Sequence, residues 1–204
     1  MRIAGLHPFY PIVPDAAWAA RVARAGARCL QLRVKDRTSN EIAAEIAATL
    51  EACSPLDCQV IVNDHWREAM REGADYVHLG QEDLATADIA ALKDELVRIG
   101  ISTHDDAELD RALAIDPDYI AIGPIYQTTS KAVTHASQGL DRISEWRDKI
   151  GPVALVAIGG ITLERAPSVI SAGADSVAVI SDVTSSADPE ARVRAWMEWA
   201  ESLR

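Results

Sequence analysis

Short apolar runs alternate with amphipathic stretches along the whole chain. The runs are rich in Val, Ile and Leu, and the stretches between them are rich in Ala, Glu and Arg. Such regular alternation predicts an α/β fold in which a parallel sheet is connected by helical crossovers. The predicted strands span residues 9–13, 28–34, 59–63, 75–79, 98–102, 118–122, 153–158 and 175–180.

Helical stretches fill the gaps between these strands. Asp15 is the predicted N-cap of a helix that ends at Gly26. Residues 38–52 repeat Ile or Leu along one helical face, and residues 185–204 form a final helix. Eight strands and about eight helices in 204 residues predict a single (βα)8 TIM barrel that covers residues 1–204. A doubly wound open sheet is the alternative, because periodicity does not show whether a sheet closes.

The composition and charge narrow the range of partners. Hydrophobic residues make up 49% of the chain and charged residues 25%, as in ordinary globular proteins. A net charge of -11 argues against a nucleic-acid-binding surface. No apolar run is long enough to cross a bilayer, and the N-terminus lacks an apolar core of signal-peptide length. The cysteines Cys29, Cys53 and Cys58 form no CxxC pair and suggest reduced thiols in a cytoplasmic protein.

The predicted second strand carries polar groups on one of its two faces. Side chains alternate along a strand, so an amide and two cations fall on the face opposite the apolar residues. These polar residues are Gln31, Arg33 and Lys35. In a (βα)8 barrel the active site lies at the C-terminal ends of the strands. Since unpaired cations are costly to bury, three polar groups in register favour an anion site over a strand end that merely reaches solvent.

Most of the other predicted strands also end in polar residues or glycines. Asp64 and Asp83 are hard oxygen ligands, and Mg²⁺ commonly uses one or two carboxylates together with phosphate oxygens. Gly159, Gly160 and Ser181 follow the last two strands, where this fold often binds phosphate through backbone N–H groups. The pattern therefore suggests two anion sites at one rim, one with a metal and one without. Taken singly, each residue could instead cap a helix or form a turn.

A set of motifs in this chain resembles the thiamine-phosphate synthase family in order and spacing. The motifs are QLRVK (31–35), ND (63–64), HLGQEDL (78–84), STH (102–104), GPIYQTTSK (123–131), VAIGGI (156–161) and AVIS (178–181). They cover nearly the whole chain, and their combination is highly specific, whereas the glycine pair alone would be a weak signal. The fold of this family is a (βα)8 barrel, in agreement with the alternation of strands and helices.

The resemblance implies a Mg²⁺-dependent transferase. In this family a hydroxymethylpyrimidine diphosphate loses pyrophosphate, and the nitrogen of a thiazole phosphate bonds to the freed methylene. The departure is thought to be dissociative, so cations and Mg²⁺ would stabilise the leaving group and no side-chain nucleophile is needed. The resemblance implies a cytoplasmic enzyme with one Mg²⁺ per active site and two small-molecule substrates. It implies no nucleic-acid or membrane partner, and it leaves room for a homo-oligomer.

Matched motif positions imply a role for each residue. The residues expected in catalysis are Arg33, Lys35, Lys131 and Ser102. Those expected to contact the pyrimidine diphosphate are Gln31, Leu32, Arg33, Val34, Lys35, Asn63, Ser102 and Lys131. Those expected to contact the thiazole phosphate are Thr128, Thr129, Ser130, Gly159, Gly160, Ile180 and Ser181. The expected metal ligands are Asp64 and Asp83.

The chain departs from the family pattern at a few positions. His65 stands where the family usually has Arg after ND, which puts one supporting contact in doubt. Pro11 and Pro14 lie in or beside the first strand, and since proline lacks a backbone donor we expect this strand to be short. The long stretch 123–139, which includes Lys131, is expected to close over the bound diphosphate.

Three other functions fit parts of the pattern. Thiazole tautomerases of the same superfamily lack part of the cation set, and we expect them to have a histidine where this chain has Pro124. A non-catalytic regulatory barrel that binds a thiamine precursor would not need both metal carboxylates. Another phosphate-binding barrel isomerase would need a general acid and base, for which the candidates are Glu82, Asp83 and His104. Otherwise His78 and His104 are expected to be structural and to satisfy backbone groups.

Overall fold

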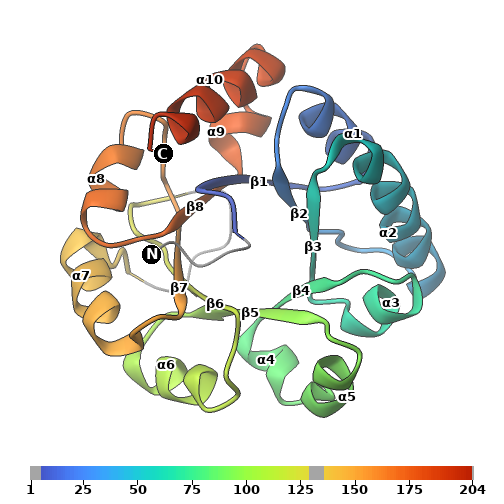
Figure 1. Cartoon of the computed structure of the whole chain (residues 1–204), viewed down its shortest axis with the longest axis horizontal. Coiled ribbons are helices and arrows are strands. Elements are labelled where there is room, and N and C mark those ends of the chain that lie inside the picture. The colour runs from blue at the N-terminus through green and yellow to red at the C-terminus, as the bar shows by residue number, and fades with distance from the viewer. Residues whose placement is uncertain (1–5, 129–135, 204) are drawn as a thin grey trace.

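Eight parallel strands close into a barrel, and helices ring its outer face (Figure 1). The structure, a computed structural model, describes residues 6–128 and 136–203. The strands pair in chain order around the barrel, and β8 closes it against β1. They are β1 (Phe9–Val13), β2 (Cys29–Leu32), β3 (Gln59–Asn63), β4 (Tyr76–Leu79), β5 (Arg98–Thr103), β6 (Tyr119–Ile122), β7 (Ala154–Ile158) and β8 (Ser176–Val179). The predicted (βα)8 barrel is confirmed, and the open sheet is excluded.

The expected N-cap at Asp15 is present, and a second helix has a cap at Thr38 that was not predicted. Asp15 accepts a hydrogen bond from the N–H of Trp18 at 2.8 Å, and Thr38 forms a capping box with Glu41. Two short helices, α4 (Gln81–Leu84) and α9 (Ser181–Thr184), come directly after β4 and β8. The other helical elements are α1 (Ala16–Arg24), α2 (Ser39–Cys53), η1 (Ser54–Leu56), α3 (Trp66–Arg71), α5 (Ile89–Asp94), α6 (Asp106–Leu113), α7 (Gly139–Ile150), α8 (Ala166–Ser171) and α10 (Pro189–Glu201).

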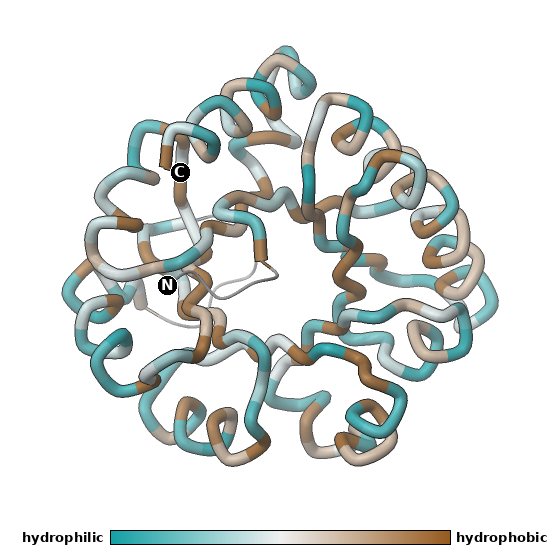
Figure 2. The backbone as a smooth tube through the Cα atoms, in the orientation of Figure 1, coloured by the Kyte–Doolittle hydropathy of each residue, from teal (hydrophilic) through white to brown (hydrophobic). Residues whose placement is uncertain are grey.

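Alternate side chains of each strand face the helices or the inside of the barrel. Outward residues such as Leu30 and Leu32 belong to the large core cluster beneath the helices. Inward residues form a second cluster, to which Tyr10, Ile61 and Tyr119 contribute from different strands. Figure 2 shows the strands as a mostly hydrophobic ring, with hydrophilic residues gathered on the outer surface of the helices. The inside of the barrel is therefore a packed core rather than a pore.

The first strand keeps its length in spite of its proline. β1 has five residues, of which the first three pair with β8 and those from Ile12 onwards pair with β2. Pro11 lies where the pairing changes from one neighbour to the other, and Pro14 lies beyond the strand. The expectation of a short strand is wrong, because the stagger of the barrel places the proline at this change of partner.

The three cysteines are free thiols in the protein interior, as expected. Cys53 and Cys58 flank η1, and the N–H of Cys58 donates to the carbonyl oxygen of Cys53 at 3.3 Å. Among the described residues, no helix is both long and apolar enough to span a bilayer.

Candidate active site

The end of β2 presents polar side chains at the mouth of the barrel, the face at which the strands end. Gln31 points inward and is only 2% exposed. β2 ends at Leu32. The next residue, Arg33, still bonds to β1, because its N–H donates to the carbonyl oxygen of Val13 at 2.8 Å. Arg33 is half-buried, whereas Lys35 is exposed. The predicted polar face therefore runs from the barrel interior out to solvent.

Leu32 and Val34 point away from this face. Both side chains are buried in the core cluster beneath the helices. Any contact of these two residues with the pyrimidine diphosphate must therefore come from their backbone atoms.

The end of β3 supplies an amide that faces the mouth without a partner. Asn63 is 5% exposed, and its Nδ2 has no hydrogen-bond partner among the described residues. Asp64 follows in the left-handed backbone region, with a φ of 65°, and donates its N–H to the carbonyl oxygen of His78 at 2.8 Å. Because an unpaired buried amide is costly, Asn63 fits a residue that hydrogen-bonds a ligand.

Asp64 and Asp83 bring two carboxyl groups together at the mouth. Burial and the neighbouring Asp83 carboxylate raise the pKa of Asp64 to about 6, and the charges of Arg33 and His65 partly oppose this rise. Asp83 lies in α4, where it also accepts the N–H of Gly80 at 3.0 Å. Two hard oxygen donors that repel each other fit Mg²⁺. Within residues 6–128 and 136–203, no group of three or more His, Cys, Asp or Glu side chains could hold a metal, so this pair would need further ligands from water or substrate.

His65 links the loop after β3 to the loop after β2. Its Nε2–H donates to the carbonyl oxygen of Val34 at 3.2 Å. Val34 lies between Arg33 and Lys35, so this bond supports the segment that carries both cations. Although the family's usual arginine is absent, a histidine donor ties the two strand ends together.

A chain of hydrogen bonds connects the mouth to the barrel interior. His78 lies between the Ser102 hydroxyl, 2.7 Å from Nε2, and the Tyr119 hydroxyl, 2.6 Å from Nδ1. A side chain at Gly100 would come within 2.1 Å of the Tyr119 ring, so glycine makes room for this arrangement. Sequence reasoning missed the contact between His78 and Ser102. The available signal was the alternation of β4, which turns Tyr76 and His78 to the inside.

The ring of His104 contacts a side chain, whereas we expected it to satisfy a backbone group. Its Nδ1 lies 2.8 Å from the carboxylate of Glu108, which also accepts the N–H of His104. Glu82 is exposed in α4. This geometry does not favour the isomerase alternative, because His104 is engaged with Glu108 rather than directed at a shared reaction centre.

The loops after β6 and β7 run side by side. The N–H of Tyr126 donates to the carbonyl oxygen of Gly159 at 3.0 Å. Gly160 has a φ of +62°, and a side chain there would come within 2.5 Å of the carbonyl oxygen of Gln127. Both the backbone conformation and the close approach require glycine at this position.

A hollow of about 710 Å³ opens between these loops and the start of α9. Three residues expected at the thiazole phosphate, namely Thr128, Gly160 and Ser181, line it together. Ile180 instead packs against the inner cluster of the barrel. The expected site residues Thr129, Ser130 and Lys131 lie outside the described residues. A larger hollow, of about 1170 Å³, lies at the opposite end among residues that precede the strands, where none of the expected site residues is found.

The family model for thiamine monophosphate synthase matches this chain over residues 9–183. The chain belongs to the thiamine monophosphate synthase family. It is 50% identical over 192 residues to the thiamine-phosphate synthase of Rhizobium etli, covering 94% of each chain. It is 47% identical over 194 residues to that of Neisseria gonorrhoeae, covering 95% of each. Its fold is similar to that of thiamine phosphate pyrophosphorylase from Pyrococcus furiosus, with a TM-score of 0.82 at 25% identity and 96% of each chain covered.

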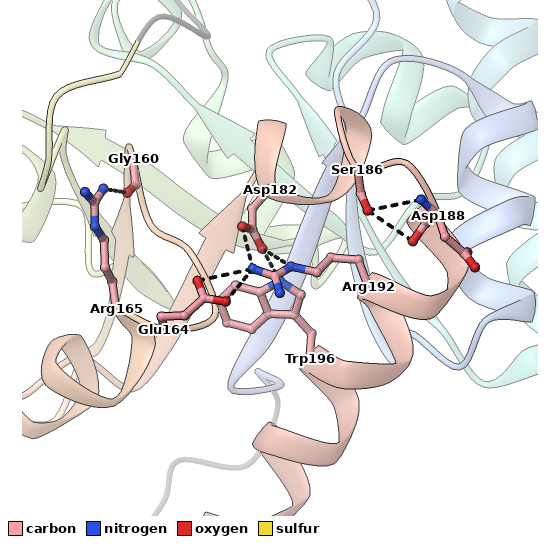
Figure 3. A network of polar contacts seen from close by, with 8 residues as sticks. All are labelled: Gly160, Glu164, Arg165, Asp182, Ser186, Asp188, Arg192 and Trp196. Atoms are coloured by element: carbon pink, nitrogen blue, oxygen red, sulfur yellow. Dashed lines mark hydrogen bonds and ion pairs between the residues drawn. The ribbon is translucent and has the colours of Figure 1, made fainter.

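Membership of the thiamine monophosphate synthase family confirms the resemblance drawn from the motifs. Two residues outside those motifs, Asp182 and Arg165, line the smaller hollow and make the polar contacts shown in Figure 3. Asp182 accepts hydrogen bonds from Arg192 and Trp196 of α10. Arg165 donates to the carbonyl oxygen of Gly160 at 2.6 Å. Sequence reasoning placed Asp182 at the end of the eighth strand but did not connect it with Arg192 and Trp196, and it missed Arg165, which lies beyond the seventh strand end.

Proposed function

We propose that this chain is a thiamine-phosphate synthase, which joins a hydroxymethylpyrimidine diphosphate to a thiazole phosphate and releases pyrophosphate. The observation that carries the proposal is the gathering of Gln31, Arg33, Asn63 and the two carboxylates at one mouth. A relative that bears this name is 50% identical over 94% of the chain. The activity is that of a transferase.

The proposed reaction exchanges one bond for another at the methylene carbon of the pyrimidine. The C–O bond breaks, and pyrophosphate leaves with the electron pair. The lone pair of the thiazole nitrogen then forms the new C–N bond, which gives thiamine phosphate. Arg33 and Lys35 offer N–H donors to the oxygens of the leaving group, and Arg33 can engage two oxygens at once. No side chain needs to act as a nucleophile.

Asn63 and Ser102 would orient the pyrimidine diphosphate. The unpaired Nδ2 of Asn63 offers a donor at the inner edge of the mouth. His78 holds the Ser102 hydroxyl at 2.7 Å, and Tyr119 fixes the opposite side of the imidazole. We infer that this chain sets the direction of the Ser102 hydroxyl before the substrate arrives.

Magnesium dependence is part of the same proposal. Asp64 and Asp83 would hold one Mg²⁺ per active site, and the raised pKa of Asp64, caused by burial and by the neighbouring Asp83 carboxylate, supports a place for a metal cation beside the pair. When bound, Mg²⁺ would neutralise charge on the departing pyrophosphate. A cytoplasmic location, the absence of nucleic-acid partners and homo-oligomer formation stay predictions.

The alternative functions are less well supported. Pro124, joined to Gly123 at the start of the loop after β6, occupies the position where we expect a histidine in tautomerases. A barrel that only binds a precursor would not need both Asp64 and Asp83, so their presence as a close pair favours catalysis. The curated relatives named above are synthases.

Incubation of the protein with both heterocyclic phosphates and Mg²⁺ tests the proposal. We expect thiamine phosphate and pyrophosphate in equal amounts, and no product in EDTA. Asp64→Ala and Asp83→Ala should each lose orders of magnitude in turnover, since both remove a proposed metal ligand. Glu82→Ala, an exposed neighbour in α4, is the matched control and should keep wild-type activity. Full activity of both aspartate variants in EDTA would overturn the metal assignment.

A further inference from the structure

The smaller hollow has to hold a phosphate dianion if the proposed function is correct, and its walls contain few cations. It is lined by Pro124, Gln127, Thr128, Ala136, Ser137, Gly160, Ile161, Thr162, Arg165, Ser181 and Asp182. Among these described residues Arg165 is the single cation, and Asp182 is an anion. The charge of the hollow therefore depends on how these two side chains are paired.

Asp182 is neutralised by neighbours behind the hollow. Arg192 donates to its two carboxylate oxygens at 2.9 and 2.8 Å, and the indole N–H of Trp196 donates at 2.7 Å (Figure 3). Arg192 also donates to Glu164 at 3.1 Å. Arg192 is thus committed to two carboxylates, and the Asp182 carboxylate is only 9% exposed. Neither group is free to meet an incoming phosphate.

Arg165 is held at the hollow by groups without charge. One guanidinium N–H donates to the carbonyl oxygen of Gly160 at 2.6 Å, and the guanidinium lies 4.5 Å from the centre of the Tyr126 ring. Within the described residues it has no carboxylate partner, in contrast to Arg192. A guanidinium has five N–H donors, so the bond to Gly160 leaves most of them available. The Tyr126 ring and the Gly160 carbonyl orient this cation without neutralising it.

We propose that Arg165 binds the phosphate of the thiazole substrate and makes this chain select the phosphate ester over the unphosphorylated thiazole alcohol. The inference rests on the proposed function and adds a specificity residue to it. The substrate phosphate would be the anionic partner of Arg165, which has no carboxylate partner among the described residues. It would lie next to the turn at Gly160, which lines the same hollow. A guanidinium suits this role because its planar fork matches two phosphate oxygens.

Arg165→Gln tests the proposal through steady-state kinetics. We expect the KM for thiazole phosphate to rise about tenfold, as for the loss of one charge-assisted hydrogen bond, with little change in kcat. The KM for pyrimidine diphosphate should stay unchanged, and the preference for thiazole phosphate over the alcohol should fall by the same factor. Tyr126→Leu, which removes the ring beneath Arg165, should show a smaller shift in the same direction. Arg194→Gln is the charge-matched control, because Arg194 lies exposed on α10 and lines neither hollow.

The outcomes separate this inference from the proposed function. If wild-type protein makes thiamine phosphate and Arg165→Gln shows an unchanged KM and an unchanged preference, the inference is wrong and the function stands. If wild-type protein makes no product, the proposed function is wrong. Calorimetric titration with thiazole phosphate then decides the role of Arg165, since weaker binding in Arg165→Gln than in Arg194→Gln supports it and equal binding rejects it.

Discussion

The facing carboxylates predict that Asp64→Asn stabilises the metal-free protein while it removes activity. In the wild-type protein, burial and the Asp83 carboxylate raise the pKa of Asp64 to about 6, so the ionised form is disfavoured in the fold. Asparagine removes this charge and keeps the shape of the side chain. It also tolerates the left-handed backbone of Asp64, which has a φ of 65°. The substitution therefore isolates the electrostatic cost of holding two carboxylates side by side in the metal-free protein.

The pKa shift sets the size of the effect. A rise from 3.8 to about 6 corresponds to about 3 kcal/mol at neutral pH, and partial exposure to solvent reduces this to roughly 1.5 kcal/mol. Because the folded-state pKa lies above the unfolded one, the wild-type protein is free of this cost below pH 3.8 and bears it fully above about pH 6. The difference in unfolding free energy between the variant and wild type should grow between these two pH values and stay constant at higher pH.

Urea unfolding in EDTA at pH 4 and pH 7.5 measures this difference. Asp57→Asn is the matched control, because Asp57 is an exposed aspartate with a φ of 51° at the opposite end of the barrel. We expect Asp64→Asn to raise the unfolding free energy at pH 7.5 and to have little effect at pH 4, and Asp57→Asn to show no such pH dependence. Addition of Mg²⁺ with pyrophosphate should raise the melting temperature of wild type but not of Asp64→Asn. A variant less stable than wild type at pH 7.5 would refute the reasoning.

Two further substitutions probe the two anion sites. Arg33→Lys should lower the single-turnover rate and leave thiazole phosphate affinity unchanged, since an ammonium lacks the planar fork, and a wild-type rate in rapid quench would reject a leaving-group role. Gly160→Ala should cost about 1–3 kcal/mol in urea unfolding and weaken thiazole phosphate binding, because it places a side chain in a left-handed turn. An unchanged unfolding midpoint for that variant would contradict the need for glycine.

The strand positions were predictable because buried parallel strands are nearly continuous apolar runs. The second strand shows where this signal ends. The apolar and polar alternation continues to Lys35, but the strand ends at Leu32, although the N–H of Arg33 still donates to Val13 of β1. Arg33 and Val34 keep the orientation of a strand without belonging to one. Sequence patterns report which way side chains face, and here the alternation continues beyond the last residue of the strand.

The pairing of side chains across the mouth could not be predicted in the same way. The contact of Asp64 with Asp83 depends on a left-handed residue after β3 and on the short helix α4, neither of which leaves a periodic signal. The partners of His78 could not be predicted for a related reason. The alternation of β4 predicts that His78 faces the inside of the barrel. Only the structure shows that Ser102 and Tyr119 contact its two ring nitrogens.

The distribution of charge explains how an acidic chain can select anionic substrates. The net charge is -11, and several arginines on the outer face are paired with carboxylates, as in Arg21 with Glu190 and Arg147 with Asp175. Arg33 and Arg165 have no ion pair among the described residues, and each lies by one of the two proposed anion sites. Since salt screens exposed charges beyond about 8 Å, a substrate at the mouth responds to these unpaired cations more than to the distant acidic surface. Selectivity therefore depends on where unpaired cations lie relative to the mouth, and net charge alone does not reveal it.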